Sequence, residues 1–169
     1  MSRVWKLLPF LFVVTFVLVA CGETIEERAV NGIKVADKAF HKERKAHNEE
    51  VDGIQFYKPI GFKVDEDSDA ENIVLNKGKQ PFTLLVNPNE AKNSQLFYDL
   101  LHADENLKVI AEEKFSDGDT FGFVAAIQNS DDTVTLIANV GGAKITTQTK
   151  EQHIAKNLET MMRIVRSID

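Results

Sequence analysis

The sequence predicts an α+β domain, with a mostly antiparallel β-sheet, a long C-terminal helix and shorter helices packed on it. Two observations predict this class. Short stretches of alternating apolar and polar residues, separated by polar turns, run from residue 54 to residue 147. A stretch with apolar residues at helical spacing then closes the chain. Hairpins followed by a helix are typical of an antiparallel sheet with helices against it.

The first 20 residues have a different composition. Arg3 and Lys6 are their only charges, and residues 7–20 form an apolar run interrupted only by Pro9 and Thr15. A basic start, a short apolar run and a small residue at its end are typical of a secretory signal peptide. Because this run is shorter than the roughly 20 residues that span a bilayer, we expect residues 1–20 to be an export signal that is removed.

The residues that end this run, Leu18-Val19-Ala20-Cys21, resemble the lipobox of bacterial lipoproteins. The resemblance implies cleavage between Ala20 and Cys21, S-diacylglycerol on the Cys21 sulfur, and a fatty acyl group such as palmitate on the new amino terminus. Cys21 is the only cysteine of the chain, so an intramolecular disulfide is excluded. Lipidation would explain why an exported protein has a single cysteine. The alternative is an uncleaved signal anchor with an incidental cysteine.

The charge of the chain restricts its partners. The chain has 20 basic and 26 acidic residues, and two of the basic residues lie in residues 1–20, so 18 basic and 26 acidic residues remain after cleavage, a net charge of −8. This balance argues against nucleic acid and against electrostatic docking on an anionic membrane. We therefore expect covalent lipid to hold the protein on the extracytoplasmic face of the cell membrane, with envelope or membrane proteins as its partners.

Residues 21–52 are interpreted as the lipid anchor and a charged helical tether. Gly32 weakens this helix by about 1 kcal/mol relative to alanine. The segment is either a helix packed on the domain or a stalk that lifts the domain from the membrane, and a partner-binding helix is a third interpretation. Its apolar residues recur at spacings of three and four, on one helix face: Ile25, Ala29, Ile33, Ala36 and Phe40.

Residues 53–169 are predicted to form the α+β domain. Gly141-Gly142 is expected to break or bulge a strand. The expected strands are residues 54–57, 62–64, 72–76, 81–87, 107–115, 120–128, 133–140 and 143–147.

Two helices are predicted in this domain. A short one covers residues 95–102, capped by Asn93 or Ser94. The second, of about 18 residues, starts at Thr149, which forms a capping-box pattern with Gln152. The side chains of the short helix that are expected to face inward are Leu96, Phe97, Leu100 and Leu101.

Two segments of the domain resemble PsbP-like domains. The stretch Phe56-Tyr57-Lys58-Pro59-Ile60-Gly61-Phe62-Lys63-Val64 is similar to their opening strand, with aromatic, proline, glycine and aromatic residues in that order. Residues 147–168 are similar to their closing helix. The resemblance covers residues 53–168 and implies an α/β/α sandwich that serves as a binding or assembly module. A fold alone does not fix a function, and Gly141-Gly142 depart from the family pattern.

No catalytic or metal-binding pattern is present in the sequence. The acidic run of residues 65–71 lacks the glycine and the closing glutamate of a calcium loop. Nucleophile, phosphate-loop and dinucleotide motifs are missing. We therefore predict a non-catalytic module without metal, cofactor or catalytic residues. The four histidines do not have zinc-site spacing and are expected on the solvated surface: His41, His47, His102 and His153.

Two alternative functions stay open. The first is a lipoprotein that binds a small ligand or a cation, which a concave pocket lined by Phe121 and Phe123 would favour. The second is an envelope hydrolase, which a pocket joining a serine or a carboxylate to a histidine would favour.

Overall fold

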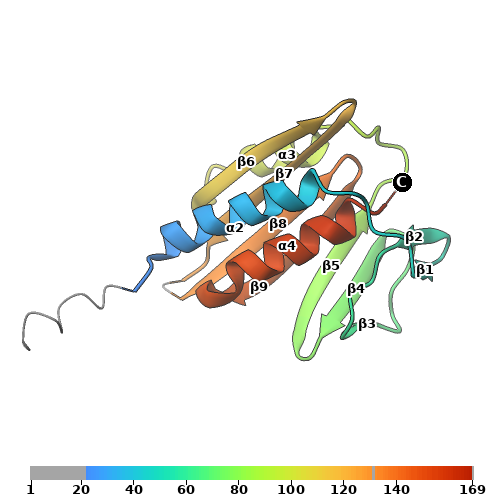
Figure 1. Ribbon diagram of the computed structural model, residues 1–169, viewed down its shortest axis with the longest axis horizontal. Coiled ribbons are helices and arrows are strands. Elements are labelled where there is room, and N and C mark those ends of the chain that lie inside the picture. Colours follow the sequence, from blue (N-terminus) through green and yellow to red (C-terminus); the bar gives the residue numbers. More distant parts are fainter. Residues whose placement is uncertain (1–21, 131, 169) are drawn as a thin grey trace, which may run out of the picture.

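A two-layer core dominates the computed structural model, which describes residues 22–130 and 132–168. Helices α2 (Ile25–Phe40) and α4 (Ile154–Val165) lie side by side on one face of a seven-stranded antiparallel sheet (Figure 1). The predicted α+β class is confirmed. The predicted signal peptide and lipid site, including Ala20 and Cys21, lie outside the described residues.

The sheet is antiparallel throughout its described strands. A separate two-stranded hairpin precedes it, formed by β1 (Glu49–Val51) and β2 (Ile54–Phe56). The seven strands, in spatial order, are β3 (Phe62–Val64), β4 (Asn72–Lys77), β5 (Gln80–Val86), β9 (Ala143–Lys150), β8 (Thr133–Val140), β7 (Thr120–Gln128) and β6 (Val109–Asp117).

Helix α2 is a packed helix and not a stalk. Four residues of its predicted apolar stripe are buried and the fifth, Ile25, packs partly buried against the same core. Its neighbour α4 contributes Leu158, Met161 and Met162, each fully buried, to this core. Gly32 is buried at the contact between the two helices. Burial of the stripe thus offsets the low helix propensity that glycine gives to the segment.

A second, smaller core lies on the opposite face of the sheet. The helix α3 (Leu96–His102) covers Phe121 and Phe123 of β7 there, with Phe97 and Leu101 buried. The expectation that Leu96 and Leu100 also face inward is wrong, because they are 38% and 56% exposed. A two-turn helix lying on a flat sheet buries one i, i+4 pair and leaves the other sides in solvent.

Of the two expected outcomes at Gly141-Gly142, a break or a bulge, the structure shows a break, because β8 ends at Val140 and β9 begins at Ala143. Val140 pairs with Ala143, so Gly141-Gly142 form a tight hairpin turn, with a φ of +51° at Gly141. A Cβ at Gly142 would lie 2.4 Å from the carbonyl oxygen of Asn87. Both glycines are therefore required by the turn and by the close approach of the loop after β5.

The starts of the two predicted helices also differ. The expected capping box at Thr149 is wrong, because β9 continues to Lys150 and a 3-10 turn (Glu151–His153) precedes α4. The Thr149 hydroxyl instead accepts a hydrogen bond from Asn157 at 3.0 Å. For α3, the N-cap is Gln95 and forms no side-chain capping bond.

Candidate functional site

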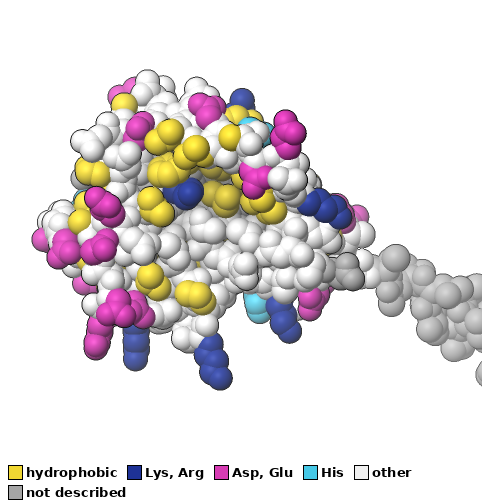
Figure 2. All heavy atoms as spheres, turned by 180° about the vertical axis from the view of Figure 1, so that it is seen from behind, with side chains coloured by type: hydrophobic (Ala, Val, Ile, Leu, Met, Phe, Trp, Pro, Cys, Tyr) yellow, Lys and Arg dark blue, Asp and Glu magenta, His cyan; other side chains and the backbone are white. Residues whose placement is uncertain are grey.

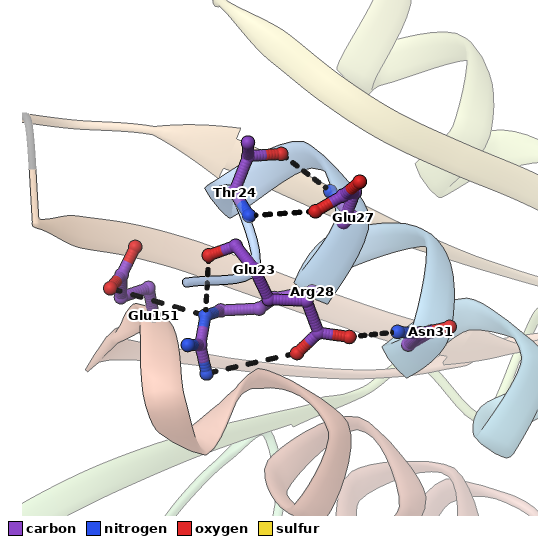
Figure 3. A network of polar contacts seen from close by, with 6 residues as sticks. All are labelled: Glu23, Thr24, Glu27, Arg28, Asn31 and Glu151. Carbon is purple, nitrogen blue, oxygen red and sulfur yellow. Dashed lines mark hydrogen bonds and ion pairs between the residues drawn. The ribbon is translucent and has the colours of Figure 1, made fainter. Parts of the chain in front are cut away.

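The start of α2 carries a complete capping box. The Glu27 amide donates to Thr24 Oγ1 at 3.2 Å, and the Thr24 amide donates to Glu27 Oε2 at 2.9 Å (Figure 3). Two amides that a helix start leaves without intrahelical partners are therefore satisfied reciprocally. The helix is consequently fixed from its first turn onward.

The residue before this cap is fastened to the domain as well. Arg28 Nε donates to the Glu23 carbonyl oxygen at 3.2 Å, and Asn31 Nδ2 donates to Glu23 Oε1 at 2.5 Å (Figure 3). Arg28 also lies 4.0 Å from Glu151 Oε1, which links this network to the turn before α4. The N-terminal ends of α2 and α4 are thus joined by polar contacts, in addition to their apolar packing.

The opposite end of the helical layer is a cationic pocket. Here the C-terminal ends of α2 and α4 meet, and Arg166 Nε donates to the Phe40 carbonyl oxygen at 3.0 Å. Beside this contact lies a cavity of about 260 Å³. We call it the cationic pocket; its lining residues are Ala39, Lys42, Glu43, Arg44, Lys45, Arg163 and Arg166.

Arg166 is the buried member of this pocket. It is 8% exposed, and its guanidinium lies 5.0 Å from the centre of the Phe40 ring. Nη2 donates to Asp117 Oδ2 at 2.9 Å, whereas Nη1 is buried and has no hydrogen-bond partner among the described residues. Burial lowers the pKa of Arg166, the positive charge of Arg44 lowers it further, and Asp117 opposes the shift.

A second cavity, also of about 260 Å³, lies beside the β8–β9 turn and is lined by both His47 and Glu90. A histidine and a carboxylate in one cavity are part of the arrangement expected of a hydrolase, which is a pocket that joins a serine or a carboxylate to a histidine. His47 Nε2 donates to the Ser167 carbonyl oxygen at 2.5 Å, and the Ser94 hydroxyl donates to Glu90 Oε2 at 2.5 Å. The described contacts therefore join histidine to a backbone carbonyl and serine to a carboxylate, which is not the nucleophile–base pair of a triad.

The aromatic pair expected to line a ligand pocket fills a core instead. Phe121 and Phe123 are 7% and 0% exposed, and both rings contact Tyr98 at centroid distances of 6.2 and 5.4 Å. Because α3 closes over them, they do not form a concave apolar site.

The sheet face that carries α3 is shown in Figure 2, where apolar side chains gather around a basic one. Lys144 Nζ lies 4.7 Å from the centre of the Phe97 ring, and burial lowers the pKa of Lys144. The aliphatic stem of a lysine covers apolar surface in this way while its ammonium group reaches water. The apolar residues left partly exposed in the molecule include Leu85, Leu96, Leu100 and Leu107.

His41, His102 and the acidic run have local partners. His41 contacts Asp37, and His102 lies 3.1 Å from Glu112. In the acidic run, Asp69 Oδ1 accepts from two backbone amides, as turn residues do. Among the described residues, no three His, Cys, Asp or Glu side chains are grouped as a metal site, and no helix of residues 22–168, Asp131 apart, is long and apolar enough to cross a bilayer.

Comparisons with known proteins show a similarity to solved structures. No protein-family model matches the chain, and no curated protein matches it. Among solved structures, it is similar to the solution structure of cyanobacterial PsbP (CyanoP) from Synechocystis sp. PCC 6803. The identity is 12%, the TM-score is 0.39, and the match covers 75% of this chain and 91% of that one.

Proposed function

We propose that the protein is a lipoprotein whose PsbP-like domain serves as a non-catalytic binding or assembly module on the extracytoplasmic face of the cell membrane. One observation supports this proposal above all. The domain is held in place from Glu23 onward, because Arg28 donates a hydrogen bond to the Glu23 backbone carbonyl and Asn31 donates one to the Glu23 side chain. A lipid on Cys21 would therefore be joined to a fixed domain through Gly22 alone.

This arrangement would keep the domain close to the bilayer. Two residue steps from Cys21 to Glu23 span at most about 7 Å. Two or three acyl chains give stable membrane binding, at about 0.8 kcal/mol per buried CH₂. The mature net charge of −8, from 18 basic and 26 acidic residues, opposes adsorption to an anionic surface. Lipid would thus be the cause of localisation, with the N-terminal ends of both helices toward the membrane.

Mass spectrometry of the N-terminus tests the anchor. We expect the wild-type chain from a bacterial membrane to begin at Cys21 and to carry diacylglycerol and an acyl group. The Cys21→Ala variant should lose both the lipid mass and stable recovery in the membrane fraction, whereas the matched Gly22→Ala variant should keep both. An unmodified wild-type chain that retains residues 1–20 would contradict the proposal.

The binding role is tested separately, by crosslinking the lipidated protein in its native membrane. We expect crosslinks to envelope or membrane proteins from surfaces away from the N-terminal ends of α2 and α4. If wild-type protein yields only the products obtained with Cys21→Ala protein released into solution, the membrane-proximal binding role fails.

A small-ligand function is the second candidate, and the cationic pocket, with its five basic side chains, is the observation that favours it.

A further inference from the structure

We propose that the outer face of β5, β9 and β8 is a docking surface for an acidic amphipathic helix of a partner protein. This face lies opposite the layer of α2 and α4, and the small core under α3 covers only the neighbouring strand β7 with parts of β8 and β6. We call the surface the open strip. Its side chains alternate along the strands with buried core positions and are those of Thr83, Leu85, Thr135, Lys144, Thr146 and Gln148.

The open strip is continuous because its residues are cross-strand neighbours. Leu85 of β5 lies opposite Lys144 of β9, and Thr83 lies opposite Thr146. Gln148 is paired with β8 on the other side. Each of these strands is hydrogen-bonded to a neighbour on both sides, so a partner cannot add to them as a further strand. It has to contact the side chains, as a helix that packs on a sheet face does.

The charge of the open strip is opposite to that of the chain. The strands β5, β8 and β9 contain no aspartate or glutamate, although the chain has 26 acidic and 20 basic residues. Lys144 lies in the strip and Lys150 ends the same strand on the same face. Neither lysine forms an ion pair among the described residues. An acidic partner is therefore attracted here, whereas the net charge of the protein repels it elsewhere.

Lys144 gives the strongest indication of an anionic partner. Its Nζ lies 4.7 Å from the centre of the Phe97 ring, and its cross-strand neighbours are the uncharged Leu85 and Asn139. Burial lowers the pKa of Lys144. The ammonium group thus loses part of its hydration without gaining a carboxylate in return. A carboxylate of a docked helix would supply that missing charge.

The apolar residues beside Lys144 favour a helix with an apolar face. Leu85 is 38% exposed and packs in neither core. Helix α3, which reaches Lys144 through Phe97, adds Leu96 and Leu100, which are 38% and 56% exposed. Figure 2 shows the apolar side chains that gather on this face. The strip has no aromatic side chain on which a sugar ring could stack. Strand β9 has eight residues and is about 27 Å long, which matches a helix of about 18 residues.

A structural explanation of the open strip has to be weighed. Antiparallel sheets commonly leave one face to water, and threonine is favoured in strands. This accounts for Thr83, Thr146 and Gln148. It does not account for Lys144, because lysines protect the edges of sheets, whereas β9 is the middle strand of seven. It also does not account for the exposed Leu85 opposite that lysine.

A synthetic helical peptide of about 18 residues, with leucines on one face and glutamates beside them, tests the open strip. Fluorescence anisotropy with the purified full chain in non-ionic detergent should show saturable binding. A peptide with lysines in place of the glutamates should bind about tenfold more weakly. Absence of saturable binding, or equal affinity for the two peptides, would overturn the proposal.

Variants of the chain locate the binding. Gln148→Glu adds a negative charge to the strip at an exposed position with almost the same shape, and should weaken the glutamate peptide about tenfold. Ser116→Glu adds the same charge at an exposed position of the edge strand β6 and should bind as wild type does. Lys144→Gln should also weaken binding, and Lys144→Arg should restore it. An equal loss in Gln148→Glu and Ser116→Glu, or a loss that arginine does not restore, would contradict the assignment.

Photo-crosslinking in the native membrane tests the partner itself. A photoreactive residue in place of Gln148 should capture a protein segment whose sequence, read by mass spectrometry, is acidic with apolar residues at helical spacing. The same residue in place of Ser116 should not capture that segment. Products with glycan or lipid, or identical products from both positions, would refute the proposed partner.

The strip and the anchor can fail independently. That the partner belongs to the envelope rests on the proposed function, whereas binding of the glutamate peptide does not. The Cys21→Ala chain should therefore bind this peptide as tightly as wild type does. Weaker binding by Cys21→Ala would show that the strip depends on the lipid and would contradict the independent site.

Discussion

Gly32 of α2 lies against Ile154 of α4 so closely that a Cβ at position 32 would be 2.8 Å from Ile154 Cγ2. It would also be 3.0 Å from Leu158 Cδ1 and 3.3 Å from the Cα of Ala155. Ile154 and Leu158 are fully buried, and the Cγ2 of a β-branched residue cannot move aside without changing a stiff χ1 angle. The glycine therefore sets the distance between the two helices.

Replacing Gly32 with alanine should destabilise the protein despite the better helix propensity of alanine. Propensity favours Gly32→Ala by about 1 kcal/mol, whereas overpacking a core costs about 1–3 kcal/mol. We expect the free energy of unfolding in urea to fall by about 1 kcal/mol. Lys34→Ala, at an exposed position of the same helix, should leave it nearly unchanged. A more stable Gly32→Ala protein would show that the helices separate easily.

Ser167 provides the second prediction, because it joins the C-terminal end of the chain to the segment after β2. Its hydroxyl donates to the Ile164 carbonyl at 2.6 Å and accepts from the Tyr57 amide at 2.8 Å, and the residue is 1% exposed. Ser167→Ala leaves that amide without its acceptor, at a cost of about 1–3 kcal/mol. Urea unfolding should show this loss, and Ser116→Ala, at an exposed position, should not.

These two residues also show what local sequence patterns can and cannot predict. The apolar stripe of α2 predicts its buried face, because helix periodicity is a local property. The same pattern assigns Gly32 only a propensity cost, since its contact with α4 joins positions more than 120 residues apart. Ser167 has no visible partner in the sequence for the same reason.

The errors at element ends have a related cause. Thr149 and Gln152 match a capping box, but Thr149 pairs with Val134 in the sheet, and strand pairing overrides the local signal. The cationic pocket joins residues 42–45 to Arg163 and Arg166, which only the parallel packing of two helices brings together. Cys21 is assigned by motif alone and lies outside the described residues.

The third prediction concerns acid pH and the β1–β2 hairpin. The hydrogen bond from Lys58 holds the pKa of Glu49 below its ordinary value of 4.5, while burial acts in the opposite direction. Because the folded-state pKa is lower than the unfolded one, the stabilisation is fully present above pH 4.5 and is lost as the pH falls through the lowered value.

The two side chains are 28% and 27% exposed, so the contribution is small, on the order of 0.2–1 kcal/mol. Glu49→Gln should therefore be less stable than wild type at pH 6 by this amount, and the difference should shrink at pH 3. Urea unfolding at the two pH values measures it. Glu105→Gln, at an exposed position without an ion pair among the described residues, should show no such change. A difference that persists at pH 3 would mean that packing, not ionisation, is responsible.

The last prediction concerns the cap that fixes the start of the domain. Thr24→Ala removes the acceptor of the Glu27 amide and should cost about 1 kcal/mol, while Thr24→Ser keeps the oxygen and should cost little. Loss of the cap frays the first turn of α2, so the amides of Glu27 and Arg28 should exchange with solvent faster in Thr24→Ala than in Thr24→Ser. If both variants exchange at the wild-type rate, the bonds that Arg28 and Asn31 make to Glu23 hold this end without the cap. In either case the exchange rates measure how rigidly the domain begins beside Cys21.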